Sequence, residues 1–321
     1  MKYNISIVIP VFNEEESIPE LIAWIERVMA VHPMLSYEVI MIDDGSSDDS
    51  WKIIQNLAKN KLCVKGVKFA RNYGKSAALH TGFRSCQGEV VITMDADMQD
   101  SPDEIPALYN MVVKDGYDIV SGWKKKRHDP ISKTIPSKFF NLVTRKISGI
   151  KLHDFNCGLK AYRHKVVKNI EVYGEMHRYI PVIAKWNGFR KIGEKVVQHR
   201  ARKYGETKYG LERFLYGFLD LLSITFVSKF KKSPMHFFGA MGTLSFIFGF
   251  FVTIYIIAKK FYEIHYSLPV REIVDQPLFF LALVALIVGV QLFLAGFVGE
   301  MITMNSPQKL DYIIDEETGI E

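Results

Sequence analysis

Two long stretches without charge near the C-terminus constrain the fold of this 321-residue chain more than any other feature. Residues 237–258 and 277–299 contain no Asp, Glu, Lys or Arg. A helix needs about 20 apolar residues to cross a hydrocarbon core of about 30 Å. A buried helix of a soluble domain is the alternative, but two such stretches joined by a short polar loop and preceded by a lysine cluster favour two transmembrane helices within residues 233–302.

The N-terminus determines the expected orientation in the membrane. Met1 leads directly into a short apolar strand, without the long apolar core or small-residue cleavage site of a signal peptide. We therefore expect residues 1–210 to stay in the cytoplasm. An even number of spans would return the tail, residues 303–321, to the same side. The expected location is the inner (cytoplasmic) membrane.

Composition narrows the classes of partner. A net charge of +6 suits anionic partners such as phosphates and the headgroups of a lipid bilayer, but no basic run indicates nucleic acid. Cys63, Cys86 and Cys157 are too few and too scattered for a disulfide framework, which suits a reducing compartment. The nine histidines show no spacing typical of metal ligands. Whether the chain forms a homo-oligomer stays open at this point.

The first 120 residues alternate short apolar runs with amphipathic segments. Ser17 begins a capping-box pattern with proline in the first turn, which predicts a helix to about Val31. Alternation of strands and helices is typical of βαβ units and predicts an α/β fold with a mostly parallel, Rossmann-like sheet covered on both faces. The expected strands cover residues 5–9, 37–42, 64–69, 89–94 and 117–120.

Polar residues follow three of these strands. In parallel sheets, ligands bind beyond the carboxyl ends of the strands, so Pro10, Asp43–Asp44 and Asp95–Asp97 should converge on one rim. Asp95 and Asp97, two residues apart, can share a hard cation through oxygen. Such a cation, Mg²⁺ or Mn²⁺, would neutralise a diphosphate as it leaves. A carboxylate at the Asp43–Asp44 turn can accept a hydrogen bond from a nucleobase N–H.

Residues 211–232 connect this region to the apolar stretches. Their apolar positions follow helical spacing while charged residues lie between them, which predicts an amphipathic helix in the membrane interface. A core helix of the soluble domain is the alternative.

Four segments together resemble family 2 inverting glycosyltransferases. They are residues 7–14 (IVIPVFNE), 43–48 (DDGSSD), 71–75 (RNYGK) and 94–100 (MDADMQD). The closer resemblance is to the dolichyl-phosphate-mannose synthase and bactoprenol glucosyltransferase branch, and it covers nearly the whole chain. It implies a GT-A catalytic domain, an interfacial helix and two spans. It also implies transfer, with inversion, of a sugar from a UDP- or GDP-linked donor to a polyprenyl phosphate such as undecaprenyl phosphate.

The resemblance further implies roles for individual residues. Residues 154–160 (DFNCGLK) are similar to the D-x-x-S-G-F-R segment near sugar and acceptor, and residues 202–208 (RKYGETK) resemble the phosphate-handling R-x-x-G-x-S-K segment. The implied catalytic residues are Asp95, Asp97, Lys124, Asp154, Arg202 and Lys208. The implied nucleotide-binding residues are Pro10, Phe12, Glu14, Asp43, Asp44, Arg71 and Lys75. The implied metal ligands are Asp95, Asp97 and Gln99.

Some positions depart from the family pattern. Lys124 and Lys160 stand where the family has arginine, and Cys157 stands where it has serine. No general base can be carried over, but a phosphate acceptor needs none, because its second pKa near 6 leaves it largely dianionic at neutral pH.

Several alternatives remain at this stage. A hydroxyl-acceptor glycosyltransferase would need a base, and a processive polysaccharide synthase should carry Gln-x-x-Arg-Trp, which the sequence lacks. A non-catalytic membrane scaffold would be expected to lose Asp95, Asp97 and Gln99, which are present. Neither apolar stretch has an ionisable residue to mark a transport pathway. The identity of the sugar and the choice between UDP and GDP stay open.

Overall fold

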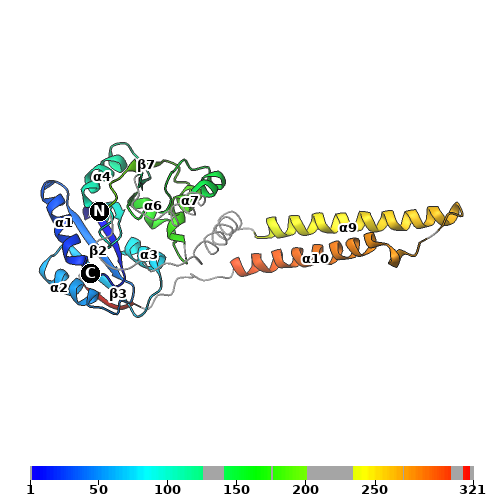
Figure 1. The fold of residues 1–321 in the computed structure, drawn as a ribbon, viewed down its shortest axis with the longest axis horizontal. Coiled ribbons are helices and arrows are strands. Elements are labelled where there is room, and N and C mark those ends of the chain that lie inside the picture. The colour runs from blue at the N-terminus through cyan, green and yellow to red at the C-terminus, as the bar shows by residue number, and fades with distance from the viewer. Residues whose placement is uncertain are drawn as a thin grey trace. The chain divides into compact units, whose positions relative to one another are not determined.

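The computed structural model describes residues 2–125, 141–174, 176–200, 234–269, 271–304 and 314–318. The chain divides into two compact units (Figure 1). Unit 1 comprises Met1–Ile224 and Leu310–Glu321, and unit 2 comprises Thr225–Lys309. The interfacial helix predicted for residues 211–232 lies outside the described residues.

Unit 1 is built on an eight-stranded sheet with the order β7-β5-β6-β4-β1-β2-β3-β8. Neighbours pair in parallel except at β6, which is antiparallel to β4 and β5, and at β8, which is antiparallel to β3. The predicted α/β fold with a mostly parallel sheet is therefore confirmed, together with its first five strands. The strands are β1 (Tyr3–Val11), β2 (Tyr37–Asp43), β3 (Val64–Phe69), β4 (Gly88–Thr93), β5 (Ile119–Trp123), β6 (Lys160–Arg163), β7 (Ile192–Val196) and β8 (Ile314–Thr318).

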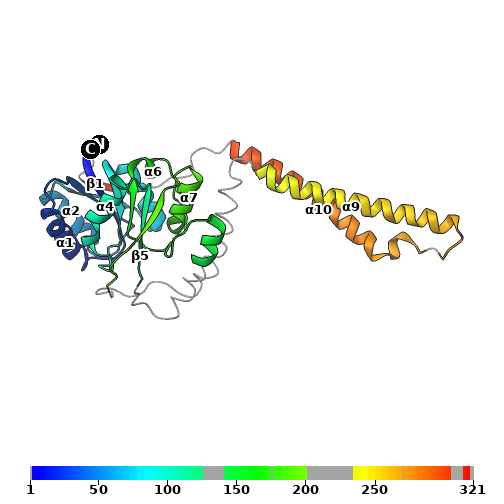
Figure 2. The same ribbon diagram turned by 90° about the horizontal axis from the view of Figure 1, so that it is seen from above.

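Helices cover both faces of this sheet (Figure 2). One face packs against α1 (Ile18–Ala30), α2 (Ser50–Asn60) and α4 (Ile105–Val113), which follows the 3₁₀ helix η1 (Pro102–Glu104). The other packs against α3 (Lys75–Ser85), α6 (His164–Lys168), η2 (Met176–Tyr179) and α7 (Ile180–Trp186).

Side chains along β1 show why both faces need cover. Ile7 and Ile9 belong to one buried cluster and Val8 to the other, because successive strand side chains point to opposite faces. A Cβ on Gly82 of α3 would lie 2.3 Å from Val8 Cγ1, so only glycine lets α3 approach this closely. The alternating apolar residues of the strands thus bind one layer of helices to each face of the sheet. The loops that connect strands to helices are positioned by the same packing.

The capping box predicted at Ser17 is wrong. Ser17 is in the N-cap position of α1, but its side chain caps no backbone N–H. Its hydroxyl instead donates to the backbone oxygen and the carboxylate of Glu14, at 3.1 and 3.0 Å. The preceding turn competes successfully for the hydroxyl, and the helix still begins at Ile18.

Strand register brings the predicted rim together. Val11 at the end of β1 pairs with Asp43 at the end of β2, and Val8 pairs with Thr93 at the end of β4. The ladder continues one step beyond the strands, because Asp44 N–H donates to Val11 O at 2.8 Å. The carboxyl ends of β1, β2 and β4 are therefore neighbours, as the sequence predicts.

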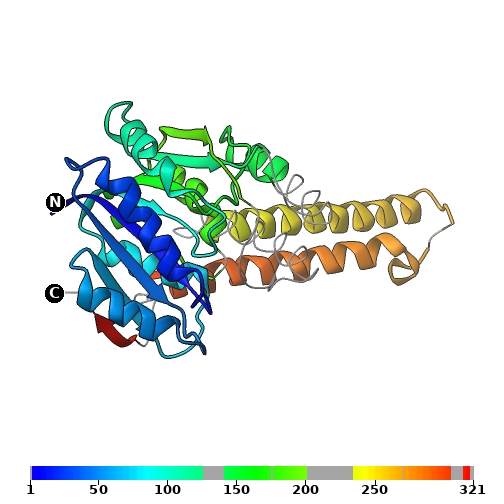
Figure 3. The same cartoon turned by 60° about the vertical axis from the view of Figure 1, so that its left-hand side comes forward.

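The C-terminal strand β8 completes the sheet at the β3 edge, where Figure 3 shows it in red. Gly66 of β3 lies opposite Thr318, and a Cβ on Gly66 would be 2.9 Å from Thr318 Cγ2. Residues before and after the apolar stretches thus share one sheet. The sequence analysis treats residues 303–321 only as a tail and does not anticipate this strand.

Unit 2 consists of two long helices, α9 (Pro234–His265) and α10 (Pro277–Met304), with the short η3 (Ile273–Asp275) before α10. Both helices are long and apolar enough to cross a membrane. Small residues let the two backbones approach, since a Cβ on Gly242 would lie 2.6 Å from Gly289 O. Ser245 Oγ donates to Ala285 O at 2.8 Å. The opposite sides expose large apolar side chains such as Leu244 and Phe251.

Candidate active site

Two loops interlock at the end of β2. Both oxygens of the buried Asp44 carboxylate accept backbone N–H bonds, from Tyr73 at 2.7 Å and Gly74 at 2.9 Å. Burial raises the pKa of Asp44 to about 6, against the opposing effect of these two donors. Gly45, at φ +72°, lies so close that a Cβ would be 2.4 Å from the carbonyl carbon of Arg71. Asp44, predicted to contact the base, therefore also anchors the loop that follows β3.

The other residues predicted to bind the nucleotide lie around these loops. Pro10 is in β1 beside Ile42, and the Phe12 side chain is partly buried just beyond the strand. Glu14 donates its N–H to Ser50 Oγ at 2.9 Å, and Asp43 Oδ1 accepts the N–H of Ser46 at 3.0 Å. The exposed Arg71 guanidinium lies 4.6 Å from the ring centroid of Tyr73. The structure thus gathers most of this predicted set at the ends of β1, β2 and β3.

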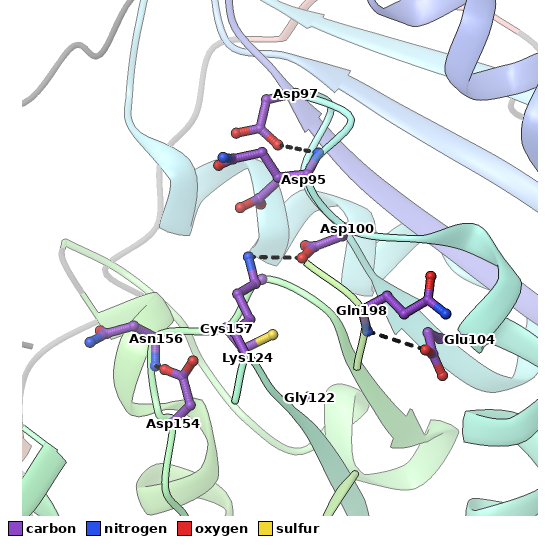
Figure 4. Close-up of polar contacts among 12 residues, drawn as sticks. Asp95, Asp97, Asp100, Glu104, Gly122, Lys124, Asp154, Asn156, Cys157 and Gln198 are labelled. Carbon is purple, nitrogen blue, oxygen red and sulfur yellow. Dashed lines mark hydrogen bonds and ion pairs between the residues drawn. The ribbon is translucent and has the colours of Figure 1, made fainter. Parts of the chain in front are cut away.

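Asp95 and Asp97 lie on the loop just beyond β4 (Figure 4). Asp95 forms an ion pair with Lys75, the first residue of α3, and Asp97 Oδ1 accepts the N–H of Gln99 at 3.2 Å. Burial favours the neutral form of Asp95, but the ammonium groups of Lys75 and Lys124 outweigh it and hold its pKa at about 2. Lys75, predicted for the nucleotide, therefore lies at the carboxylate pair.

The Gly158 backbone lies close to the Asp95 carboxylate and leaves no room for a side chain. A Cβ at this position would lie 2.6 Å from Asp95 Oδ2. The glycine is fixed there because Thr93 Oγ1, at the end of β4, donates to Gly158 O at 2.8 Å. The segment before β6 thus forms one wall of the Asp95 site.

The Lys124 side chain, just after β5, is held in an ion pair and is not free to bind the acceptor phosphate. Its ammonium group lies 2.8 Å from Asp100 Oδ1, with the lysine side chain 13% exposed and Asp100 fully buried. Burial works against the charged form of Lys124, but the Asp100 carboxylate outweighs it and raises the pKa of Lys124. The pair ties the end of β5 to the loop after β4 (Figure 4).

Asp154 is also buried, at 1% exposure. Its Oδ1 accepts the N–H of Asn156 at 3.0 Å, and its own N–H donates to Glu194 Oε1 at 3.0 Å. Glu194 of β7 also accepts the N–H and the ring of His153, both at 2.7 Å. Asp154 therefore organises the segment leading to Gly158.

The chain after β7 runs along the loop that carries the carboxylates. Arg200 N–H donates to Gln99 O at 3.0 Å, and His199 forms a β-bridge with Asp100. The predicted phosphate-binding residues Arg202 and Lys208 follow in the sequence but lie outside the described residues.

The donor set at Asp95 and Asp97 fits a hard divalent cation bound together with a diphosphate. Among the described residues, no group of three or more His, Cys, Asp or Glu side chains could hold a metal alone. Mg²⁺ is usually held by one or two carboxylates plus substrate phosphates, rather than by an all-protein cage. The ionised Asp95 carboxylate, paired with Lys75, and the Asp97 carboxylate on the same loop supply the protein part of such a site.

The structure adds residues that the sequence analysis did not select. Asp100 and Glu194 hold Lys124 and Asp154 in place. Lys160 is 3% exposed, and burial lowers its pKa. Arg178 in η2 is 9% exposed and lines a small cavity with Lys75 and Lys160. Of these, Asp100 and Lys160 stand inside quoted motifs, but nothing in the sequence links Arg178 to Lys75.

Solved structures show the same fold. Glucosyl-3-phosphoglycerate synthase from Mycobacterium tuberculosis, in complex with Mn²⁺ and UDP-glucose, matches with a TM-score of 0.53 at 19% identity, covering 71% of this chain and 79% of that one. Mannosyl-3-phosphoglycerate synthase from Rubrobacter xylanophilus matches with a TM-score of 0.56 at 16% identity, covering 69% and 73%. At such identities the likeness establishes the GT-A fold alone.

Sequence comparison goes further. The chain is 34% identical over 302 residues to the dodecaprenyl-phosphate galacturonate synthase of Rhizobium johnstonii, covering 93% of this chain and 87% of the relative. It is 36% identical over 304 residues to the undecaprenyl-phosphate 4-deoxy-4-formamido-L-arabinose transferase of Aeromonas hydrophila, covering 93% and 88%. The model of Glycosyl transferase family 2 matches residues 6–171. With this match and these relatives, the chain belongs to glycosyl transferase family 2 and is a glycosyltransferase.

Proposed function

We propose that the enzyme transfers a sugar from a nucleoside diphosphate sugar to a polyprenyl phosphate, with inversion at the anomeric carbon. The observation that carries the donor side is the Asp95–Asp97 pair beyond β4, with Lys75 paired to Asp95. The acceptor side rests on two relatives, matched over most of their length, whose names specify dodecaprenyl and undecaprenyl phosphate.

In this proposal, different residues bind the nucleotide, bind the diphosphate and compensate the negative charge of the substrates. The interlocked loops at Asp44 and Tyr73 would receive the nucleotide, and the Asp95–Asp97 pair would face the diphosphate. When bound there, Mg²⁺ or Mn²⁺ supplies positive charge to the departing diphosphate. Lys75 and the Lys124–Asp100 pair keep cationic groups near Asp95, so two anionic substrates can approach each other. Arg202, Lys208 and Gln99 remain predictions for phosphate and metal binding.

Membrane attachment follows from the same proposal. The outer sides of α9 and α10 expose aromatic and aliphatic side chains, including Phe251 at 63% and Leu244 at 66% exposure. Exposed apolar surface on two helices of this length suits lipid better than water. We infer that α9 and α10 span the bilayer and hold the enzyme where its lipid acceptor lies, with the catalytic unit in the cytoplasm.

The test is direct transfer. Membranes containing the full chain are incubated with undecaprenyl phosphate and a panel of radiolabelled UDP- and GDP-sugars, and lipid extracts are counted. A labelled lipid that Asp97→Ala membranes do not form supports the proposal, and NMR of that lipid should show inversion. Transfer only to a hydroxyl acceptor, with none to the lipid phosphate, would refute it.

A further inference from the structure

A polar side chain, Gln291, lies on the outer side of the helical hairpin. Gln291 is exposed, and it follows Gly289 by two residues, or about 200° around α10, while Gly289 is in close contact with α9. Among the described residues of unit 2, the Gln291 side chain has no hydrogen-bond partner. Ser245 Oγ, by contrast, faces the other helix and donates to Ala285 O at 2.8 Å. The amide of Gln291 therefore needs a partner from outside the hairpin.

The position of Gln291 along α10 keeps this amide inside the hydrocarbon core of a bilayer. The uncharged stretch of α10 covers residues 277–299, so its midpoint is residue 288. At a rise of about 1.5 Å per residue, Gln291 lies about 4.5 Å from that midpoint. A hydrocarbon core of about 30 Å then leaves about 10 Å to the nearer surface, which is longer than a glutamine side chain. Two N–H bonds and a carbonyl oxygen would thus face lipid tails, where each unpaired group costs free energy.

The surface around Gln291 is shaped to pack against another helix. At intervals of three and four residues, the exposed neighbours on its side of α10 are Val284, Val288, Ala295 and Val298. We call these four residues and Gln291 the Gln291 stripe. Its spacing is that of the seam between two helices packed side by side, and small or β-branched side chains let the backbones approach. The bulky Phe293 and Phe297 lie on other sides of the helix.

Three features favour a second copy of this chain as the occupant of the stripe. A glutamine amide both donates and accepts hydrogen bonds, so two of them are complementary to each other. Every copy inserts in the same direction, so two α10 helices run parallel and each Gln291 lies at the same depth as its counterpart. The stripe carries no charge, so two identical stripes do not repel each other. A different protein would need a matching polar group at this depth.

We propose that two copies of the chain associate in the membrane through α10, with the two Gln291 amides hydrogen-bonded to each other across a two-fold axis. The inference rests on the bilayer-spanning helices inferred under the proposed function. In such a symmetric contact, residues on the axis meet their own counterparts. One polar pair in an apolar seam also fixes the register of the two helices.

Cysteine cross-linking of the full chain in its membranes tests the contact. All three native cysteines lie in unit 1, so the parent chain gives the baseline. Val288→Cys and Ala295→Cys place a thiol in the stripe, and the matched controls Val290→Cys and Phe297→Cys place one on another exposed side of α10. With copper phenanthroline as oxidant, the stripe variants should form at least about fivefold more disulfide-linked dimer than the controls, because two Cα atoms must approach within about 7 Å.

Energy transfer between dye-labelled full chains in phosphatidylcholine vesicles measures the contribution of the amide. Gln291→Leu, which keeps a similar volume, should weaken association about three- to thirtyfold, the value of interhelical hydrogen bonds in lipid. Gln291→Asn keeps an amide and should lose less. The matched control Val290→Leu, an apolar change outside the stripe, should alter association less than about twofold.

Several results would overturn the proposal. They are equal cross-linking at all four cysteine positions, association that Gln291→Leu leaves unchanged, and a cross-linked product whose mass is not twice that of the chain, which would assign the stripe to a different protein. If Gln291→Leu does not insert, Val288→Cys and Val290→Cys, which both keep Gln291, decide. Release of the chain from membranes by alkaline carbonate would refute the spanning helices and this contact together. Dimers that transfer no sugar to lipid would refute the proposed function alone.

Discussion

Replacing Lys124 by methionine should destabilise the catalytic unit severely. The change leaves the Asp100 carboxylate, which is fully buried, without the ammonium group that now lies 2.8 Å away. Breaking a buried ion pair by removing one partner typically costs about 3–5 kcal/mol. Because the Lys124 side chain is 13% exposed, we expect the lower end of that range, about 3 kcal/mol. For a unit of this size that corresponds to a fall in Tm of roughly 6–12 °C.

Thermal unfolding of the full chain in detergent measures the effect. Lys61→Met is the matched control, since the Lys61–Glu26 pair is 32% and 33% exposed and should be worth about 0–1 kcal/mol. The double variant Asp100→Asn/Lys124→Met removes both charges and should recover most of the lost stability. A Lys124→Met variant that melts within about 2 °C of the wild type would refute the reasoning. Turnover of the double variant then tests catalysis: full activity would make Lys124 purely structural.

Three further predictions concern the same rim. Gly158→Ala should lower turnover at least about tenfold with the fold intact. The alanine Cβ would lie 2.6 Å from Asp95 Oδ2 and displace the carboxylate that must face the diphosphate. Near-normal kinetics of this variant would contradict the prediction. Asp97→Asn should raise the Mn²⁺ concentration for half-maximal turnover about tenfold or more, measured by metal titration after chelation, and an unchanged titration would remove Asp97 from the metal site. The raised pKa of Asp44, about 6, means that the folded state binds a proton more tightly than the unfolded state, so this group's contribution to stability falls as pH rises from about 4 to 6. Unfolding of Asp44→Asn should lack that slope, and parallel pH profiles of the two proteins would contradict the assignment.

The rim was predictable because it depends on local pattern. Strands β1, β2 and β4 are apolar runs with proline or an acidic residue at or just beyond the end, so Pro10, Asp43 and Asp95 mark these strand ends in the sequence. Parallel pairing then brings those ends together whatever the details of packing. The family resemblance points to the same residues.

Contacts between distant segments were not predictable. The strands β6 and β7 (KAYR and IGEKV) are short and carry Lys, Arg, Gly or Glu, so neither alternation nor β-propensity distinguishes them from loops. Their pairing with neighbouring strands makes them strands. Arg178 meets the cavity lined by Lys75 across about a hundred residues of sequence, and Lys124 meets Asp100 across a strand and a helix. Only the assembled sheet brings these charges together.

The pairing of β8 with β3 makes the catalytic unit discontinuous in sequence, and this matters for protein engineering. Residues 1–224 and 310–321 belong to one unit, so a chain cut before α9 would lack one strand of its own sheet. The hydrogen-bonding groups of β3 would then be open to other chains, an established route to aggregation. A water-soluble catalytic fragment should therefore keep both pieces, with a short flexible linker in place of the helical hairpin. For the same reason, an affinity tag fused directly after Thr318 would be attached to the end of β8 and could disturb its pairing with β3.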